Sequence, residues 1–215
     1  MKRFMGDLAH AMRVYMKEHM PLYVFVAVLF ITGVIFGVVI LQALTLEQKQ
    51  ELSRHLGNFF QAVDIGLEWD KQHSFLQSFM LNIKWLGLIC FLGLSVIGLP
   101  FILFMDFLKG VLIGFTVGFM VGEYAWKGML FALASVVPQN LLVIPCLIIC
   151  SVTSIAFGLQ LLKTRFLKQH LKLPLSINRF IITTLSLSMV LLIVSLYEAL
   201  LSPWVMKWVT PMLIT

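Results

Sequence analysis

The chain has 215 residues, of which 60% are hydrophobic and 12% charged, with a formal net charge of +6. An ordinary soluble domain has about 25% charged residues, so this composition excludes a soluble protein. Several apolar runs of about 20 residues instead predict an all-α, polytopic integral membrane protein with five transmembrane helices. No stretch is polar enough for a separate soluble domain, and residues 1–215 are therefore expected to form a single membrane domain.

The N-terminal segment is amphipathic and basic. Residues 1–20 place apolar side chains along one helical stripe and lysines and arginines on much of the remaining surface. We expect a cytoplasmic helix that lies on the anionic membrane surface. A first transmembrane span over residues 22–41 follows it.

The longest polar segment comes next, and we interpret residues 43–81 as an extracytoplasmic helical segment. Thr45 and Gln48 have the spacing of a capping box at the start of a helix. Four apolar residues then share one helical face that would meet either the bilayer or a partner protein. They are Leu52, Leu56, Phe59 and Phe60.

The second span is predicted over residues 82–104, as the continuation of a helix that begins at Ser74. Gly98 and Pro100 should bend this helix near its inner end. Asp106 and Lys109 would follow at a tight turn, where they form an ion pair at the cytoplasmic interface. The alternative is that this pair latches a hairpin or contacts a cytoplasmic partner.

The third span, over residues 108–122, contains glycine at every fourth position. This spacing puts all the glycines on one narrow helix face, where another backbone can approach closely. The face is either a packing seam within one subunit or a seam between two copies of the chain in a homodimer. Its members are Gly110, Gly114, Gly118 and Gly122.

The fourth span, over residues 139–162, is interrupted by prolines, and residues 129–137 would form a short re-entrant or interfacial half-helix. Backbone groups released at the breaks need partners inside the protein, which side-chain amides can supply. The alternative is a substrate or ion site, because broken helices are typical of transporters. The motif comprises Pro138, Gln139, Asn140 and Pro145. A basic cytoplasmic loop (163–179) and a fifth span (180–200) complete the chain.

The distribution of charge predicts the orientation. With the N-terminus inside, the cytoplasmic segments hold ten of the 16 basic and three of the ten acidic residues. The positive-inside rule therefore favours an N-in, C-out arrangement. It also places the positive charge at the membrane surface and argues against nucleic acid as a partner.

The sequence contains none of the usual catalytic motifs, such as HExxH, GxSxG or a P-loop. Cys90, Cys146 and Cys150 lie in apolar spans and are expected to be small buried side chains. Asp106, Lys84 and Glu198 are placed near the ends of spans, so we predict no ion relay. No catalytic residues, metal or cofactor are expected, and the chain is predicted not to be an enzyme.

The stretches GLPFILFMDFLKGVLIGFTVGFM (98–120) and VVPQNLLVIP (136–145) resemble the stage II sporulation protein M family of endospore-forming bacteria. The resemblance implies a multi-pass protein of the mother-cell membrane that is needed for engulfment of the forespore. It also implies two partners, stage II sporulation proteins P and D, which are peptidoglycan-degrading enzymes held by this scaffold. The family has no established catalytic residues.

A second functional class remains open at the level of the sequence. The broken fourth span, the glycine-lined third span and the basic inner loops would also suit the membrane subunit of an exporter-like complex. Such a subunit would couple transport or mechanical work to an ATPase on a separate chain.

Overall fold

The computed structural model describes residues 19–64, 71–95, 97–167, 178 and 180–196. Helices are the only regular secondary structure within these residues, which confirms the all-α class. The helices are α2 (Met20–Ala43), α3 (Leu46–Asp64), α4 (Lys71–Gly93), α5 (Gly98–Ser135), α6 (Val137–Leu167) and an unlabelled helix, Phe180–Leu196. Four of the described helices are long and apolar enough to cross a membrane, whereas Phe180–Leu196 is shorter.

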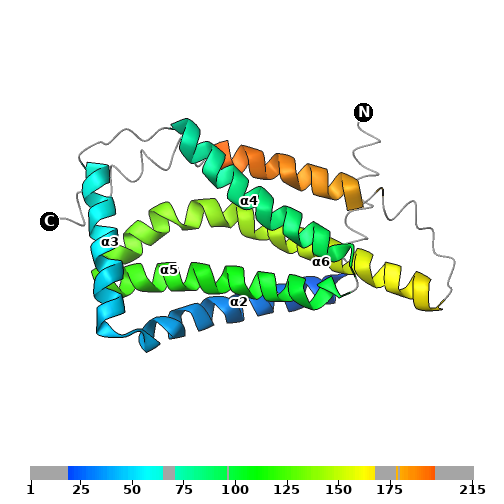
Figure 1. Ribbon diagram of the computed structural model, residues 1–215, viewed down its shortest axis with the longest axis horizontal. Helices are drawn as coiled ribbons and strands as arrows, with labels where there is room; N and C mark the ends of the chain where they lie inside the picture. The colour runs from blue at the N-terminus through cyan, green and yellow to red at the C-terminus, as the bar shows by residue number, and fades with distance from the viewer. Residues whose placement is uncertain (1–18, 65–70, 96, 168–177, 179, 197–215) are drawn as a thin grey trace.

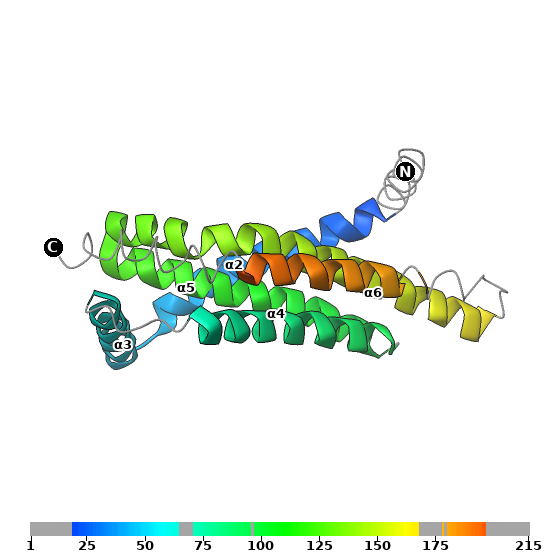
Figure 2. The ribbon, with the colours of Figure 1, turned by 90° about the horizontal axis from the view of Figure 1, so that it is seen from above.

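The long helices run side by side along the longest axis of the molecule, and α3 lies across one end of them (Figure 1). Seen from above, α3 is viewed nearly along its own axis beside the ends of the other helices (Figure 2). The expected N-terminal helix, much of the basic loop 163–179 and the end of the fifth span lie outside the described residues.

The core of the bundle is built around α6. Its buried apolar side chains, including Val143, Leu147 and Val152, pack with Leu86 from α4 and Ile102 from α5. The buried part of α6 is unusually rich in small residues, which let neighbouring helices approach closely. The long, mainly apolar run Asn140–Leu162 agrees with the burial of α6 among the other helices.

The second span ends earlier than we predicted. The helix does not continue from Ser74 to residue 104: α4 begins at Lys71 and stops at Gly93, a short turn follows, and α5 begins at Gly98. A Cβ at Gly98 would collide with the backbone of Leu92, so this turn requires glycine. Pro100 lies in the first turn of α5, where its missing N–H costs no hydrogen bond. The Gly-Leu-Pro motif therefore starts a helix rather than bending one.

The chain reverses its direction inside α5, at Ala125. This residue has φ of 48° and ψ of −125°, outside the right-handed helical region. A Cβ at Gly128 would clash with the backbone of Met120, although residues eight apart in a straight helix are about 12 Å apart. The segment after Ala125 therefore folds back along the bundle and leads into α6 (Figure 1).

Candidate functional site

The glycine face of α5 is occupied by α2 of the same chain. Alanine at Gly110 or Gly114 would place its Cβ against the backbone of Phe30 or Val34. The α2 side of the contact is also glycine, because a Cβ at Gly33 or Gly37 would meet the α5 backbone. At Gly110 and Gly114, α2 therefore covers the face that a second copy of the chain would need for a homodimer seam.

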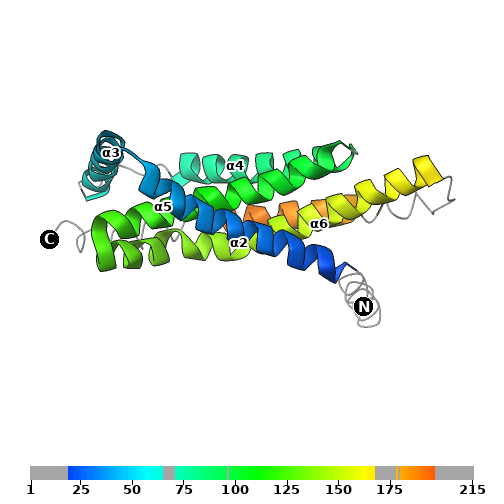
Figure 3. The ribbon, with the colours of Figure 1, turned by 90° about the horizontal axis from the view of Figure 1, so that it is seen from below.

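The seam loosens toward the α3 end of the bundle. A Cβ at Gly118 would lie 3.3 Å from Val38 Cγ2, and one at Gly122 would lie 3.7 Å from Leu41 Cδ2. Residue numbers rise together on the two helices, so α2 and α5 run parallel up to the reversal. Figure 3 shows α2 on the outside of the bundle, crossing over α5.

This register sets the height of the charged residues on α5. Gly33 lies opposite Phe107 and Gly110 near the middle of α2. Asp106 and Lys109 are therefore at mid-height, about 12 and 16 Å along α5 from Gly98 at 1.5 Å per residue. The prediction that they lie at a tight turn was wrong, because the break between the two helices lies between Gly93 and Gly98.

Asp106 is buried against α6. Its side chain is only 4% exposed, and Ser151, which is fully buried, donates a hydrogen bond of 2.8 Å to Asp106 Oδ1. The other carboxylate oxygen, Oδ2, has no hydrogen-bond partner among the described residues. A buried carboxyl group with one short hydrogen bond is costly in an apolar environment, and in a membrane helix it marks a candidate functional position.

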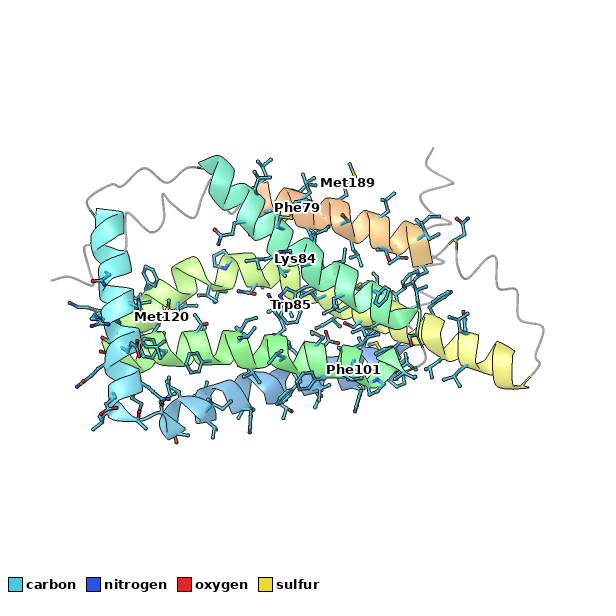
Figure 4. The ribbon with its side chains drawn as sticks, viewed as in Figure 1. Phe79, Lys84, Trp85, Phe101, Met120 and Met189 are labelled. Carbon is cyan, nitrogen blue, oxygen red and sulfur yellow. The ribbon has the colours of Figure 1, made fainter. Side chains whose placement is uncertain are left out.

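Two lysines lie at the same height. Lys109 Nζ is 5.3 Å from the centroid of the Trp85 ring, a cation–π contact between α5 and α4. Lys84 is at the middle of the candidate span Leu76–Gly93 and is exposed (Figure 4). A lysine at the centre of a membrane helix costs about 3 kcal/mol on insertion scales. We refer to Lys84, Trp85, Asp106, Lys109 and Ser151 as the mid-height polar layer.

Two thiol groups and a hydroxyl group form a separate contact between three helices. Cys90 Sγ is 3.5 Å from Cys150 Sγ and 3.5 Å from Thr184 Oγ1, which joins α4, α6 and helix Phe180–Leu196. All three cysteines are free thiols, and Cys146 and Cys150 are buried.

Within the described part of the chain, no three His, Cys, Asp or Glu side chains gather as metal ligands would. The absence of a metal or cofactor stays a prediction.

A second set of contacts holds α3 against one end of the bundle. Thr45 and Gln48 form the predicted capping box, with N–H···O distances of 3.1 and 3.4 Å. Ser53 donates a hydrogen bond of 2.7 Å to Glu123 Oε1 at the α5 reversal. Leu56 packs on a small cluster of Met120, Phe131 and Ala132. These contacts attach α3 across the hairpin of α5.

The apolar stripe predicted as a partner surface is therefore partly used inside the chain. Leu56 faces the α5 hairpin, and Leu52 is half-buried. The side chains of Phe59 and Phe60 lie outside the described residues. Partner docking by this stripe stays a prediction. The polar side of α3, which faces away from the α5 hairpin, is exposed.

The proline-containing motif forms a mild junction. α6 begins at Val137, so Pro138 is in its first turn, and Pro145 lies inside the helix. Asn140 donates hydrogen bonds to the Val136 carbonyl oxygen from its backbone N–H at 3.2 Å and its Nδ2 at 2.8 Å. The Asn140 amide thus bonds a carbonyl oxygen that the helix already satisfies, and the side chain of Gln139 lies outside the described residues. That these amides satisfy the backbone groups released by the prolines stays a prediction.

The half-helix expected over residues 129–137 is the end of α5 followed by the junction at Val136. The backbone N–H of Val136 still donates to the Ala132 carbonyl oxygen at 2.9 Å, so the ladder of hydrogen bonds nearly continues into α6. Phe131 is 2% exposed. Whether this segment re-enters a membrane stays a prediction.

The parallel glycine seam, the buried centre of α6 and the apolar outer surface together define a polytopic, all-α membrane protein. A family model described as stage II sporulation protein M matches residues 26–203. The chain belongs to this family, and it is a multi-pass membrane protein related to sporulation. The family is not a known enzyme family. Comparisons with curated proteins and with solved structures gave no match.

Proposed function

We propose that the chain is a non-catalytic membrane scaffold that recruits and holds peptidoglycan-degrading enzymes at the septal or engulfing membrane during endospore formation. Its partners would be stage II sporulation proteins P and D, and its location the mother-cell membrane. Membership of the stage II sporulation protein M family supports a role in sporulation. The further steps rest on the geometry of one end of the bundle.

The observation that carries the proposal is the attachment of α3 to the hairpin of α5. A scaffold needs a docking surface that is held rigidly by the membrane core. The Ser53–Glu123 hydrogen bond and the packing of Leu56 fix α3 across the hairpin of α5. The opposite side of α3 remains exposed and charged, and it includes Glu47, Glu51 and Arg54. With the N-terminus inside, this surface faces the cell wall.

Co-purification from sporulating cells tests the proposal. We would compare the tagged full chain with the double variant Glu51→Lys/Arg54→Glu, which inverts charges on the exposed side of α3. The control is Glu51→Asp/Arg54→Lys, which keeps each charge. The account expects recovery of the peptidoglycan hydrolases to fall several-fold in the inverted variant alone. Equal recovery by both variants, or none with the unaltered chain, would contradict it.

The membrane subunit of an exporter-like or ATPase-coupled complex is the second candidate. The mid-height polar layer favours it, because a buried carboxyl group such as that of Asp106 is a frequent element of transport sites. The same purification separates the two functions. An ATPase recovered in place of wall hydrolases would support the exporter and contradict the scaffold.

A further inference from the structure

The mid-height polar layer carries an excess of positive charge. Lys84 and Lys109 are two cations, and Asp106 is the one acidic group at this height among the described residues. Even if the Asp106 carboxylate offsets the charge of Lys109, the charge of Lys84 is not balanced. No hydrogen bond or ion pair joins Lys84 to another side chain in the described part of the chain.

Lys84 lies on a continuous exposed face of α4. Met80, Leu88 and Phe91 are 53%, 41% and 72% exposed on the same side of the helix. Gly87, one turn from Lys84, is exposed, and a Cβ built there would meet no atom of the described residues within 4 Å. The face thus combines apolar side chains, an open notch at a glycine and one central cation.

Lipid alone does not accommodate this cation well. The hydrocarbon core is about 30 Å thick, so the interface is about 15 Å from its middle. The four-methylene stem of lysine is much shorter than this distance, which limits snorkelling. Phosphates of anionic lipids lie at the interface and not at the height of Lys84. A carboxylate in a neighbouring transmembrane helix is the group that would balance the charge there.

A second copy of the chain does not supply that carboxylate from its described residues. Apart from Asp106, which is buried, the described acidic residues are Glu47, Glu51, Asp64 and Glu123. All four lie in α3 or at the reversal of α5. Because the described acidic residues of a second copy lie at a different height, we infer that the occupant is a different protein.

We propose that the exposed face of α4 around Lys84 and Gly87 docks a transmembrane helix of a partner protein, and that this helix carries an Asp or Glu near its middle. The carboxylate pairs with Lys84, and the backbone of the partner helix approaches α4 at Gly87. This inference rests on the proposed scaffold role and names the chemistry of its partner within the membrane. It gives the chain a lateral contact in addition to the α3 surface.

Synthetic transmembrane peptides test the proposal directly. The full chain, labelled with a fluorescent acceptor in phosphatidylcholine vesicles, is titrated with donor-labelled Leu-Ala peptides that carry a central Asp, Lys or Leu. We expect the Asp peptide to bind about tenfold more tightly than the Leu peptide, which corresponds to about 1.4 kcal/mol. Equal binding of the Asp and Leu peptides would overturn the proposal.

Three variants identify the residues responsible. Lys84→Leu, at an exposed position, should remove the preference for the Asp peptide, and Lys84→Glu should transfer it to the Lys peptide. Gly87→Leu should weaken binding of the Asp peptide although Lys84 is kept, an effect that charge attraction alone would not produce. An Asp preference that survives Lys84→Leu, or binding unchanged by Gly87→Leu, would refute this docking mode.

The outcome is separable from that of the scaffold proposal. If the peptides show no preference but hydrolases still co-purify through the charged side of α3, only the α4 contact is refuted. If the peptide preference holds and no hydrolase is recovered, the scaffold role is refuted and the α4 contact stands. A photocrosslinker at Leu88 that yields only dimers of the chain would also overturn the choice of a different protein as the partner.

Discussion

Ser151 donates a 2.8 Å hydrogen bond to Asp106 Oδ1 and thereby connects the middle of α6 to the middle of α5. Both side chains are almost fully buried. Removing one partner of a buried hydrogen bond leaves the other unsatisfied, at a cost of about 1–3 kcal/mol.

We therefore expect Ser151→Ala to lower the free energy of unfolding by about 1–3 kcal/mol. The double variant Ser151→Ala/Asp106→Leu should recover much of this loss, because no unpaired carboxyl group remains. The measurement is SDS-induced unfolding in mixed micelles, followed by circular dichroism. Thr116→Ala is the control, since the Thr116 hydroxyl is exposed and bonds to its own helix. A Ser151→Ala variant as stable as the unaltered chain would contradict the stabilising role of the bond.

The glycine seam gives a graded prediction. Gly114→Val should destabilise the fold by about 1–3 kcal/mol or more, because overpacking forces α2 away from α5. Gly122→Ala should change stability little, since its Cβ would be in ordinary contact with Leu41. Gly57→Ala, where nothing lies within 4 Å, is the matched control. The same unfolding titration checks the order, and equal effects at residues 114 and 122 would rule out the described register.

The pair of thiols provides a test of the α4–α6 contact. Treatment of membranes with copper-phenanthroline should join Cys90 to Cys150, as the two thiols give up two protons and two electrons to the oxidant. The two Sγ atoms are already 3.5 Å apart. Peptide mass spectrometry would identify the product. A Cys90–Cys146 product in its place would mean that α6 is rotated relative to the structure.

The reversal at Ala125 predicts an uncommon response to substitution. At a positive φ, glycine avoids a steric cost of about 1–2 kcal/mol that other residues carry. Ala125→Gly should therefore raise the free energy of unfolding by about 1 kcal/mol, and Ala125→Val should lower it. Thermal unfolding followed by circular dichroism would detect both changes. Destabilisation by glycine would show that Ala125 is helical and that the chain does not reverse there.

The sequence was informative where local chemistry decides the structure. The capping box at Thr45 and the small-residue face of α5 were predicted from spacing alone, because each depends on residues within a few turns of one another. The partner of that face, α2, was not predicted, although Gly33 and Gly37 are the one other pair of glycines four residues apart in the sequence.

The mid-height polar layer was missed for a specific reason. Gly-Leu-Pro at residues 98–100 was interpreted as a bend inside the second span, and this moved Asp106 to a turn. The signal that we missed is the stretch between Lys84 and Asp106, residues 85–105, which contains no charged residue. This interval is long enough for two half-spans and a turn, with both charges at the same height.

The central claim of the account is that the charged side of α3 faces the cell wall while the α4–α5 turn faces the cytoplasm. The most direct measurement is labelling of Glu51→Cys and Ile97→Cys, each in a chain without its three native cysteines, by a membrane-impermeant maleimide on intact protoplasts. The account predicts that Glu51→Cys is labelled from outside and that Ile97→Cys is labelled only after the membrane is opened. The reverse pattern would place α3 in the cytoplasm, away from any wall enzyme, and would contradict the scaffold.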